Sequence, residues 1–152
     1  MKSKPTKFSL RDYHNEYCSK LKELGDLLGH DTKIPKTGLY HLAYPDAAWY
    51  VDAKVVPEKV PLVVFEVLCS ESEKAIRGSV SSILLYGSPI GILVLVTEMY
   101  KHFRNKDLEG WKKYVTELVK TLGLERRIFL WDETKVDHFL EKVRNDLKVR
   151  KS

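Results

Sequence analysis

The sequence has no long apolar run, and this lack excludes a membrane-spanning helix. Its longest uninterrupted apolar stretch, residues 89–96, has eight residues, whereas a helix needs roughly 20 to cross a bilayer. Residues 1–5, which read Met-Lys-Ser-Lys-Pro, are followed by no apolar segment, so we expect no signal peptide. These absences together predict a cytoplasmic protein without a membrane anchor.

Cysteine and glutamine are also scarce. Cys18 and Cys69 are the only cysteines, and we find no CxxC motif and no Cys/His pairing for zinc; we therefore predict reduced, mostly buried thiols. The chain has no glutamine and only three asparagines among many lysines and glutamates, a bias reported for thermophilic proteins. Gly87 and Gly91 flank Pro89 but fit neither glycine-rich phosphate-binding pattern, which argues against a nucleotide-binding loop.

Positive charge is concentrated at the two ends of the chain. Lys and Arg total 26 while Asp and Glu total 21, which gives +5 over 152 residues. Residues 1–7 carry +3 and residues 134–152 carry another +3, which leaves residues 8–133 at −1. We therefore predict a single domain over residues 1–152, with a flexible basic segment at 1–7 and a basic tail at 149–152. The excess of basic residues favours a polyanionic partner.

Hydrophobic periodicity predicts a chain in which strands and helices alternate. Residues 90–96 are apolar on both faces, which is typical of a central strand covered on both sides. The predicted elements are a helix at 8–28, strands at 37–44, 46–51 and 62–68, a helix at 71–86, a strand at 90–96, a helix at 106–122, a strand at 127–131 and a helix at 134–148. This order is typical of an α/β fold with a mixed sheet flanked by helices.

Three acidic residues, Glu16, Asp46 and Glu66, lie in otherwise apolar surroundings. If strands 46–51 and 62–68 pair antiparallel in a symmetric register, Asp46 lies opposite Glu66. Directly opposed side chains are about 5 Å apart, so two carboxylates in these positions repel each other unless a cation binds between them. Mg²⁺, which prefers oxygen ligands and keeps several waters, is the expected ion.

The spacing of these acids resembles a known nuclease signature. Pro45-Asp46, followed after 19 residues by Glu66-Val67-Leu68, is similar to the PD…(D/E)xK motif of the PD-(D/E)XK nuclease superfamily, which includes many restriction endonucleases and archaeal Holliday-junction resolvases. The resemblance covers residues 8–97 and implies the restriction-endonuclease-like fold, an α-β-β-β-α-β core, here with a C-terminal α-β-α extension. It also implies that Asp46 and Glu66 hold Mg²⁺ or Mn²⁺, and that Glu16 on the first helix completes the site.

Leu68 stands where the family has its lysine, which positions or activates the attacking water. Three explanations are open. The cation can come from the following helix, where Lys74 is nearest and Arg77 lies closer to the apolar stripe; metal-bound water alone can provide the nucleophile; or catalysis has been lost and the scaffold only binds. His14, on the other shoulder of the first helix from Glu16, is assigned no role.

A basic stretch follows the predicted central strand. Lys101, Arg104 and Lys106 form a loop there, and loops at the carboxyl ends of strands frame the ligand crevice of open sheets. With the basic chain ends they predict phosphate contacts to DNA without strong sequence specificity. We therefore predict a divalent-metal-dependent nuclease that hydrolyses DNA phosphodiester bonds. The alternative is a catalytically degraded nuclease-fold module for DNA binding or assembly, and since many relatives act as dimers, the resemblance also allows a homodimer.

Overall fold

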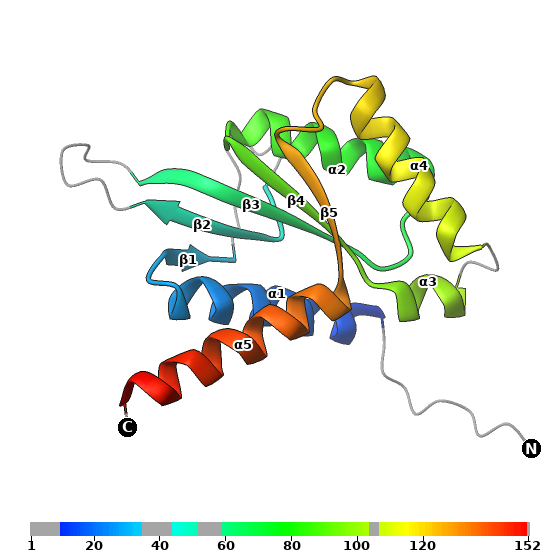
Figure 1. The fold of residues 1–152 in the computed structure, drawn as a ribbon. Helices are drawn as coiled ribbons and strands as arrows, with labels where there is room; N and C mark the ends of the chain where they lie inside the picture. The colour runs from blue at the N-terminus through cyan, green and yellow to red at the C-terminus, as the bar shows by residue number, and fades with distance from the viewer. Residues whose placement is uncertain (1–9, 35–43, 52–58, 104–106, 152) are drawn as a thin grey trace, which may run out of the picture.

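The computed structural model describes residues 10–34, 44–51, 59–103 and 107–151, with the side chains of 102 and 103 excepted. The chain forms a five-stranded sheet with helices on both faces (Figure 1). In chain order the elements are α1 (Leu10–Leu27), β1 (Asp31–Lys33), β2 (Ala47–Val51), β3 (Val60–Leu68), α2 (Glu73–Tyr86), β4 (Ile90–Leu95), α3 (Thr97–Phe103), α4 (Leu108–Thr121), β5 (Ile128–Asp132) and α5 (Glu133–Lys151). The predicted α/β class, with a mixed sheet flanked by helices, is confirmed.

The strands follow one another across the sheet in chain order, β1-β2-β3-β4-β5. β1 pairs antiparallel with β2, and β2 pairs antiparallel with β3. β3 and β4 are parallel, as are β4 and β5, which requires a crossover between the members of each pair. α2 provides the first crossover, and α3 with α4 provides the second. β4 therefore lies between two parallel neighbours, as its apolar sequence predicts.

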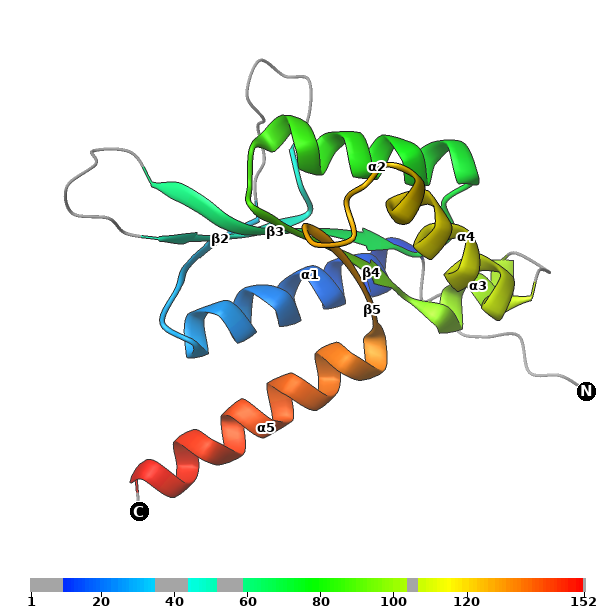
Figure 2. The ribbon, with the colours of Figure 1, turned by 45° about the horizontal axis from the view of Figure 1, so that its top comes forward.

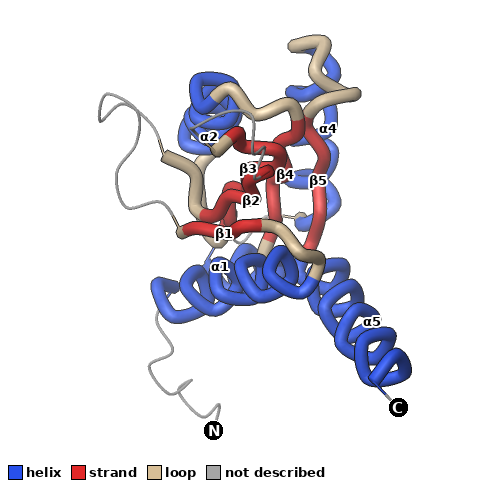
Figure 3. Tube along the Cα trace, turned by 90° about the vertical axis from the view of Figure 1, so that its left-hand side faces the viewer, coloured by secondary structure: helices blue, strands red, loops and turns tan. Residues whose placement is uncertain are grey.

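The sheet separates two layers of helices. α1 and α5 pack on one face, and α2 and α4 pack on the other (Figures 2 and 3). Alternate residues of β3 enter the two cores: Phe65 and Val67 pack with α1 and α5, whereas Val64 and Leu68 pack with α2 and α4. Because both faces of β3 are covered, a charged side chain in this strand is removed from water unless it lies at the strand end.

The first strand differs from the expectation. β1 is a three-residue strand at Asp31–Lys33, placed directly after the left-handed turn at Gly29, whose φ is 83°. It pairs with β2 through Thr32 and Trp49. Three polar residues give no hydrophobic pattern, so sequence periodicity could not find this strand. The strand predicted at 37–44 lies almost entirely outside the described residues.

The region after β4 also differs from the expectation of a basic loop and one helix. α3 begins at Thr97, directly after β4, and α4 follows as a separate helix. The carboxylate of Glu133, from the start of α5, accepts hydrogen bonds from the backbone N–H groups of Thr97 (3.0 Å) and Glu98 (3.1 Å). This cap comes from a residue far along the chain, so local sequence does not reveal it. Lys101 therefore lies in a helix, while Arg104 and Lys106 lie outside the described residues.

The chain ends are described only in part. Residues 1–7, predicted as a flexible basic segment, lie outside the described residues. α5 continues to Lys151, so the last described residues of the predicted basic tail are helical. None of the helices in the described ranges is long and apolar enough to span a membrane.

α1 approaches the sheet closely at Gly25. The indole Nε1 of Trp49 donates a hydrogen bond to the carbonyl oxygen of Leu21 (2.9 Å), which ties β2 to α1. A Cβ atom added at Gly25 would lie 2.5 Å from that same Nε1 and would also meet the methyl group of Thr32. Both neighbours are buried, so they have little room to move away.

We expect Gly25→Ala to lower the free energy of unfolding by about 1–3 kcal/mol, because the new methyl group overpacks this contact. Gly78→Ala is the matched control: Gly78 is also helical, and a Cβ there meets nothing within 4 Å. That substitution should stabilise by about 0.5–1 kcal/mol through helix propensity alone. Urea denaturation of both variants measures the difference, and equal effects would contradict the close approach at Gly25.

Candidate functional site

The pairing of β2 with β3 brings Asp46 and Glu66 together. Ala47 is the partner of Phe65, and the backbone N–H of Asp46 donates to the carbonyl oxygen of Phe65 (2.9 Å). The next step along the ladder sets Asp46 level with Glu66, so the predicted register is confirmed. Asp46, which directly precedes β2, and Glu66 of β3 thus meet near the carboxyl end of β3.

Glu66 is buried, with 8% of its surface exposed. Burial raises the pKa of its carboxyl group far above the usual range, and the charge of Asp46 and a hydrogen bond with Asp46 raise it further. The charge of Glu71 acts in the same direction. Positive charge placed beside Glu66 would stabilise the ionised form of its carboxyl group, because the side chain has acidic neighbours and little contact with water.

Asp46 is held from two sides. Its Oδ2 accepts a hydrogen bond from the backbone N–H of Val67 (2.7 Å), and its Oδ1 lies 3.1 Å from Nε2 of His14. Asp46 side-chain atoms are 24% exposed and those of His14 are 31% exposed, so solvent reaches the pair. The backbone bond fixes the orientation of the carboxylate and leaves one oxygen directed at α1.

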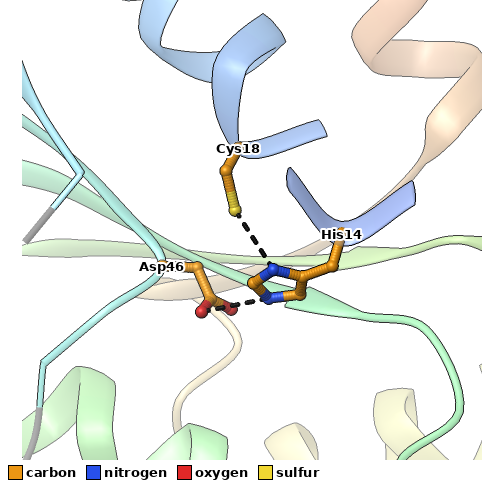
Figure 4. A group of neighbouring side chains, drawn as sticks. All are labelled: His14, Cys18 and Asp46. Carbon is orange, nitrogen blue, oxygen red and sulfur yellow. Dashed lines mark hydrogen bonds and ion pairs between the residues drawn. The ribbon is translucent and has the colours of Figure 1, made fainter. Parts of the chain in front are cut away.

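His14 and Cys18 extend the site onto α1. They are one helical turn apart, and Sγ of Cys18 lies 3.7 Å from Nδ1 of His14. Figure 4 shows the imidazole between the thiol and the carboxylate of Asp46, with one ring nitrogen turned to each. The hydrogen bond with Asp46, followed by that with Cys18, raises the pKa of His14 to about 11 against the opposing effect of burial. His14 is therefore a cation beside Asp46 at neutral pH.

Acidic groups continue past the end of β3. Glu71 accepts hydrogen bonds through Oε2 from the backbone N–H groups of Cys69 (2.5 Å) and Ser70 (2.9 Å). Tyr100 of α3 donates to the carbonyl oxygen of Glu71 (3.1 Å). Burial, and then the charge of Glu71, raise the pKa of Cys69 to about 12, so this thiol stays protonated. Glu71 thus adds a third acidic side chain near Asp46 and Glu66.

Glu16, predicted to complete the site, is engaged elsewhere. Its Oε1 lies 3.1 Å from Nζ of Lys20, and the same Nζ lies 2.8 Å from Oδ1 of Asp137 in α5. Glu16 therefore belongs to an ion-pair network that joins α1 to α5. The residue of α1 that contacts Asp46 is His14.

The two residues considered as replacements for the family lysine are exposed on α2. Nη1 of Arg77 donates to the hydroxyl group of Tyr114 in α4 (3.1 Å), rather than to a carboxylate of the site. Lys74 is exposed, consistent with its predicted place opposite the apolar stripe of α2. Leu68 itself is fully buried in the core between the sheet, α2 and α4, so the position of the lysine is filled by a packing residue.

Sequence reasoning missed His14 and Cys18. The signal was present, because residues four apart on a helix share a face and both types bind metals. This pattern does not stand out in the sequence, because His14 lies at the edge of the apolar stripe and Cys18 is typical of a buried core thiol. Only the tertiary packing of α1 on β2 shows that the pair faces Asp46.

Comparisons with models of protein families, with curated proteins and with solved structures found no match. The candidate site consists of the Asp46–Glu66 pair, the imidazole of His14 and the thiol of Cys18.

We expect Glu66→Gln to stabilise the metal-free protein by about 1–3 kcal/mol at neutral pH. The raised pKa of Glu66 means that the folded state keeps a proton that the unfolded state loses above about pH 4.3. The free energy of unfolding should therefore fall as pH rises from about 5 to 8, and the substitution should remove much of that fall.

Urea denaturation in excess chelator, repeated across this pH range, measures the effect. Glu117→Gln is the control, because Glu117 is exposed on α4 and its carboxylate lies 4.0 Å from Nζ of Lys113. A Glu66→Gln variant that is less stable than the parent at every pH would contradict a strained, buried carboxylate at this position.

Proposed function

We propose that the chain is a divalent-metal-dependent nuclease of the PD-(D/E)XK type that hydrolyses DNA phosphodiester bonds. The observation that carries the proposal is the opposition of Asp46 and Glu66 across β2 and β3, which matches the motif spacing and the family's use of the two acids. The element order through β4 and the mixed sheet also agree with the restriction-endonuclease-like core that the resemblance implies.

The chemistry of the two carboxylates fits Mg²⁺ or Mn²⁺. Both ions prefer oxygen ligands, and Mg²⁺ is commonly held by one or two carboxylates while keeping several waters. The buried Glu66 is neutralised in the metal-free chain by its raised pKa, and a divalent cation would stabilise its charged form instead. Such an ion supplies polarisation of the scissile phosphate and a water of lowered pKa.

The chain's own residues then have distinct roles. Asp46 is oriented by the N–H of Val67 and presents an oxygen to the ion, while Glu66 provides the second ligand from β3. Among the described cationic side chains, His14 is the one in contact with an acid of this pair. We assign to it part of the charge that the family lysine provides, because a cation at this distance stabilises negative charge developing on a phosphate.

DNA is the proposed substrate because the chain carries a net charge of +5, which favours a polyanionic partner. β3 and β4 are parallel, so their carboxyl ends meet at the same edge of the sheet, and α3 begins there at Thr97. Lys101 of α3 is exposed. Exposed basic groups such as this one favour contact with the phosphate backbone, which carries no sequence information.

A catalytically degraded module that binds DNA or assembles with other proteins is the second candidate. It is favoured by Leu68, which is fully buried, and by the contact of Arg77 with Tyr114 rather than with the acids. On this account the fold persists, but a leucine that packs in the core occupies the position of the cation that the chemistry requires.

Cleavage of duplex, single-stranded and four-way-junction DNA in the presence of Mg²⁺ or Mn²⁺ tests the first candidate. We expect Asp46→Asn and Glu66→Gln each to reduce the cleavage rate by at least ~100-fold, because each removes a metal ligand, whereas Glu117→Gln should cleave like the parent. Cleavage that persists in excess chelator, or in both site variants, would contradict the proposal. Salt-sensitive DNA binding by the parent without cleavage would favour the second candidate.

A further inference from the structure

The His14–Cys18 pair brings ligand types to Asp46 that a magnesium site does not use. His14 and Cys18 share one face of α1, and that face is packed toward the start of β2. Each of the three residues offers one ligand atom, and these nitrogen, sulfur and oxygen atoms all lie within 4.8 Å of one another. A tetrahedral zinc site has ligand atoms roughly 3.5 Å apart, so the cluster is slightly wider than a closed site.

We propose that His14, Cys18 and Asp46 form a binding site for a borderline divalent ion of the Zn²⁺ class, which overlaps the hard-metal site at Asp46. Imidazole and thiolate ligands select such ions over Mg²⁺, which prefers oxygen. The set has the three protein ligands typical of an open zinc site. The fourth position can take water, because His14 and Asp46 are partly exposed.

In the metal-free chain the imidazole lies between the other two ligands. Its Nε2 faces Oδ1 of Asp46 at 3.1 Å, and its Nδ1 faces Sγ of Cys18 at 3.7 Å. A bound ion would take one of these ring nitrogens together with the carboxylate and the thiolate.

Overlap at Asp46 makes the site regulatory, a consequence that rests on the proposed function. Asp46 has one oxygen tied to the N–H of Val67 and the other directed at His14. An ion held by Cys18 and His14 takes that second oxygen and replaces the contact between His14 and Asp46. The hard-metal site therefore loses an oxygen ligand when this ion binds.

The direct test is titration of the full, reduced chain with Co²⁺ in the absence of DNA. We expect absorption from thiolate-to-cobalt charge transfer in the parent chain, and its displacement by Zn²⁺. Cys18→Ser, Cys18→Ala and His14→Gln should each weaken Zn²⁺ binding by at least ~10-fold and remove or reduce the charge-transfer band. Thermal unfolding of each variant identifies any that fails to fold, and the two Cys18 variants provide independent readings.

Cys69→Ala is the matched control. Cys69 is the other cysteine, it is equally buried at 4% exposed, and it lies at the end of β3 outside the three-ligand set. This variant should keep the band and the Zn²⁺ affinity. Cobalt bound without a charge-transfer band, an unchanged affinity in both Cys18 variants, or a band lost only in Cys69→Ala would each overturn the inference.

The outcome is separable from that of the proposed function. A chain that never cleaves DNA but gives the Cys18-dependent band supports this site and contradicts the nuclease. A chain that cleaves DNA with Mg²⁺ but gives no charge-transfer band supports the nuclease and contradicts this site. Where both hold, Zn²⁺ should inhibit cleavage by the parent more strongly than cleavage by Cys18→Ala, and equal inhibition would overturn the overlap at Asp46.

Discussion

The antiparallel register between β2 and β3 is the constraint on which the candidate site depends. It brings Asp46 level with Glu66 and places both beside the carboxyl ends of the parallel strands β3 and β4. A slip of one residue would turn the side chains of β3 to opposite faces of the sheet. Because the two faces have separate hydrophobic cores, such a slip would disrupt the side-chain packing in both cores. The cores therefore enforce the position of the acids.

The same packing explains why the site combines burial with charge. Glu66 is surrounded by apolar strands and helices, and its pKa is raised for that reason. His14 enters from α1 with its Nε2 3.1 Å from Oδ1 of Asp46, and the carboxylate of Glu71 lies past the strand end. Functional sites commonly store such electrostatic strain, which a bound ion or substrate relieves. In this chain the residues concerned are Asp46, Glu66 and His14, which β2, β3 and α1 position independently of one another.

The parts of the fold that the sequence revealed are those with strong periodicity. β4 is apolar on both faces and was found with its bounds nearly correct, and the register of Asp46 with Glu66 followed from the lengths of two strands and their loop. β1 was missed because three polar residues carry no pattern. The start of α3 was missed because its cap, Glu133, comes from a distant part of the chain.

The residues of the candidate site also fall into those that the sequence predicts and those that depend on tertiary packing. Asp46 and Glu66 were predictable because one β-ladder joins them, whereas the prediction of Glu16 as the contributing residue of the first helix could not take account of how α1 rotates against the sheet. That rotation is set by buried residues such as Leu21 and by the close approach at Gly25, which places His14 against Asp46 and leaves Glu16 with Lys20. Tertiary packing therefore decides which residue of α1 contacts Asp46.

The central claim is that Asp46 and Glu66 together hold a divalent cation. Anomalous diffraction from crystals of the chain soaked in Mn²⁺ tests it most directly, because the signal locates the ion without reference to activity. The account predicts a peak within coordination distance of both carboxylates, at about 2.0–2.6 Å from their oxygens. A peak confined to other residues, or no peak at the Asp46–Glu66 pair at saturating Mn²⁺, would contradict it.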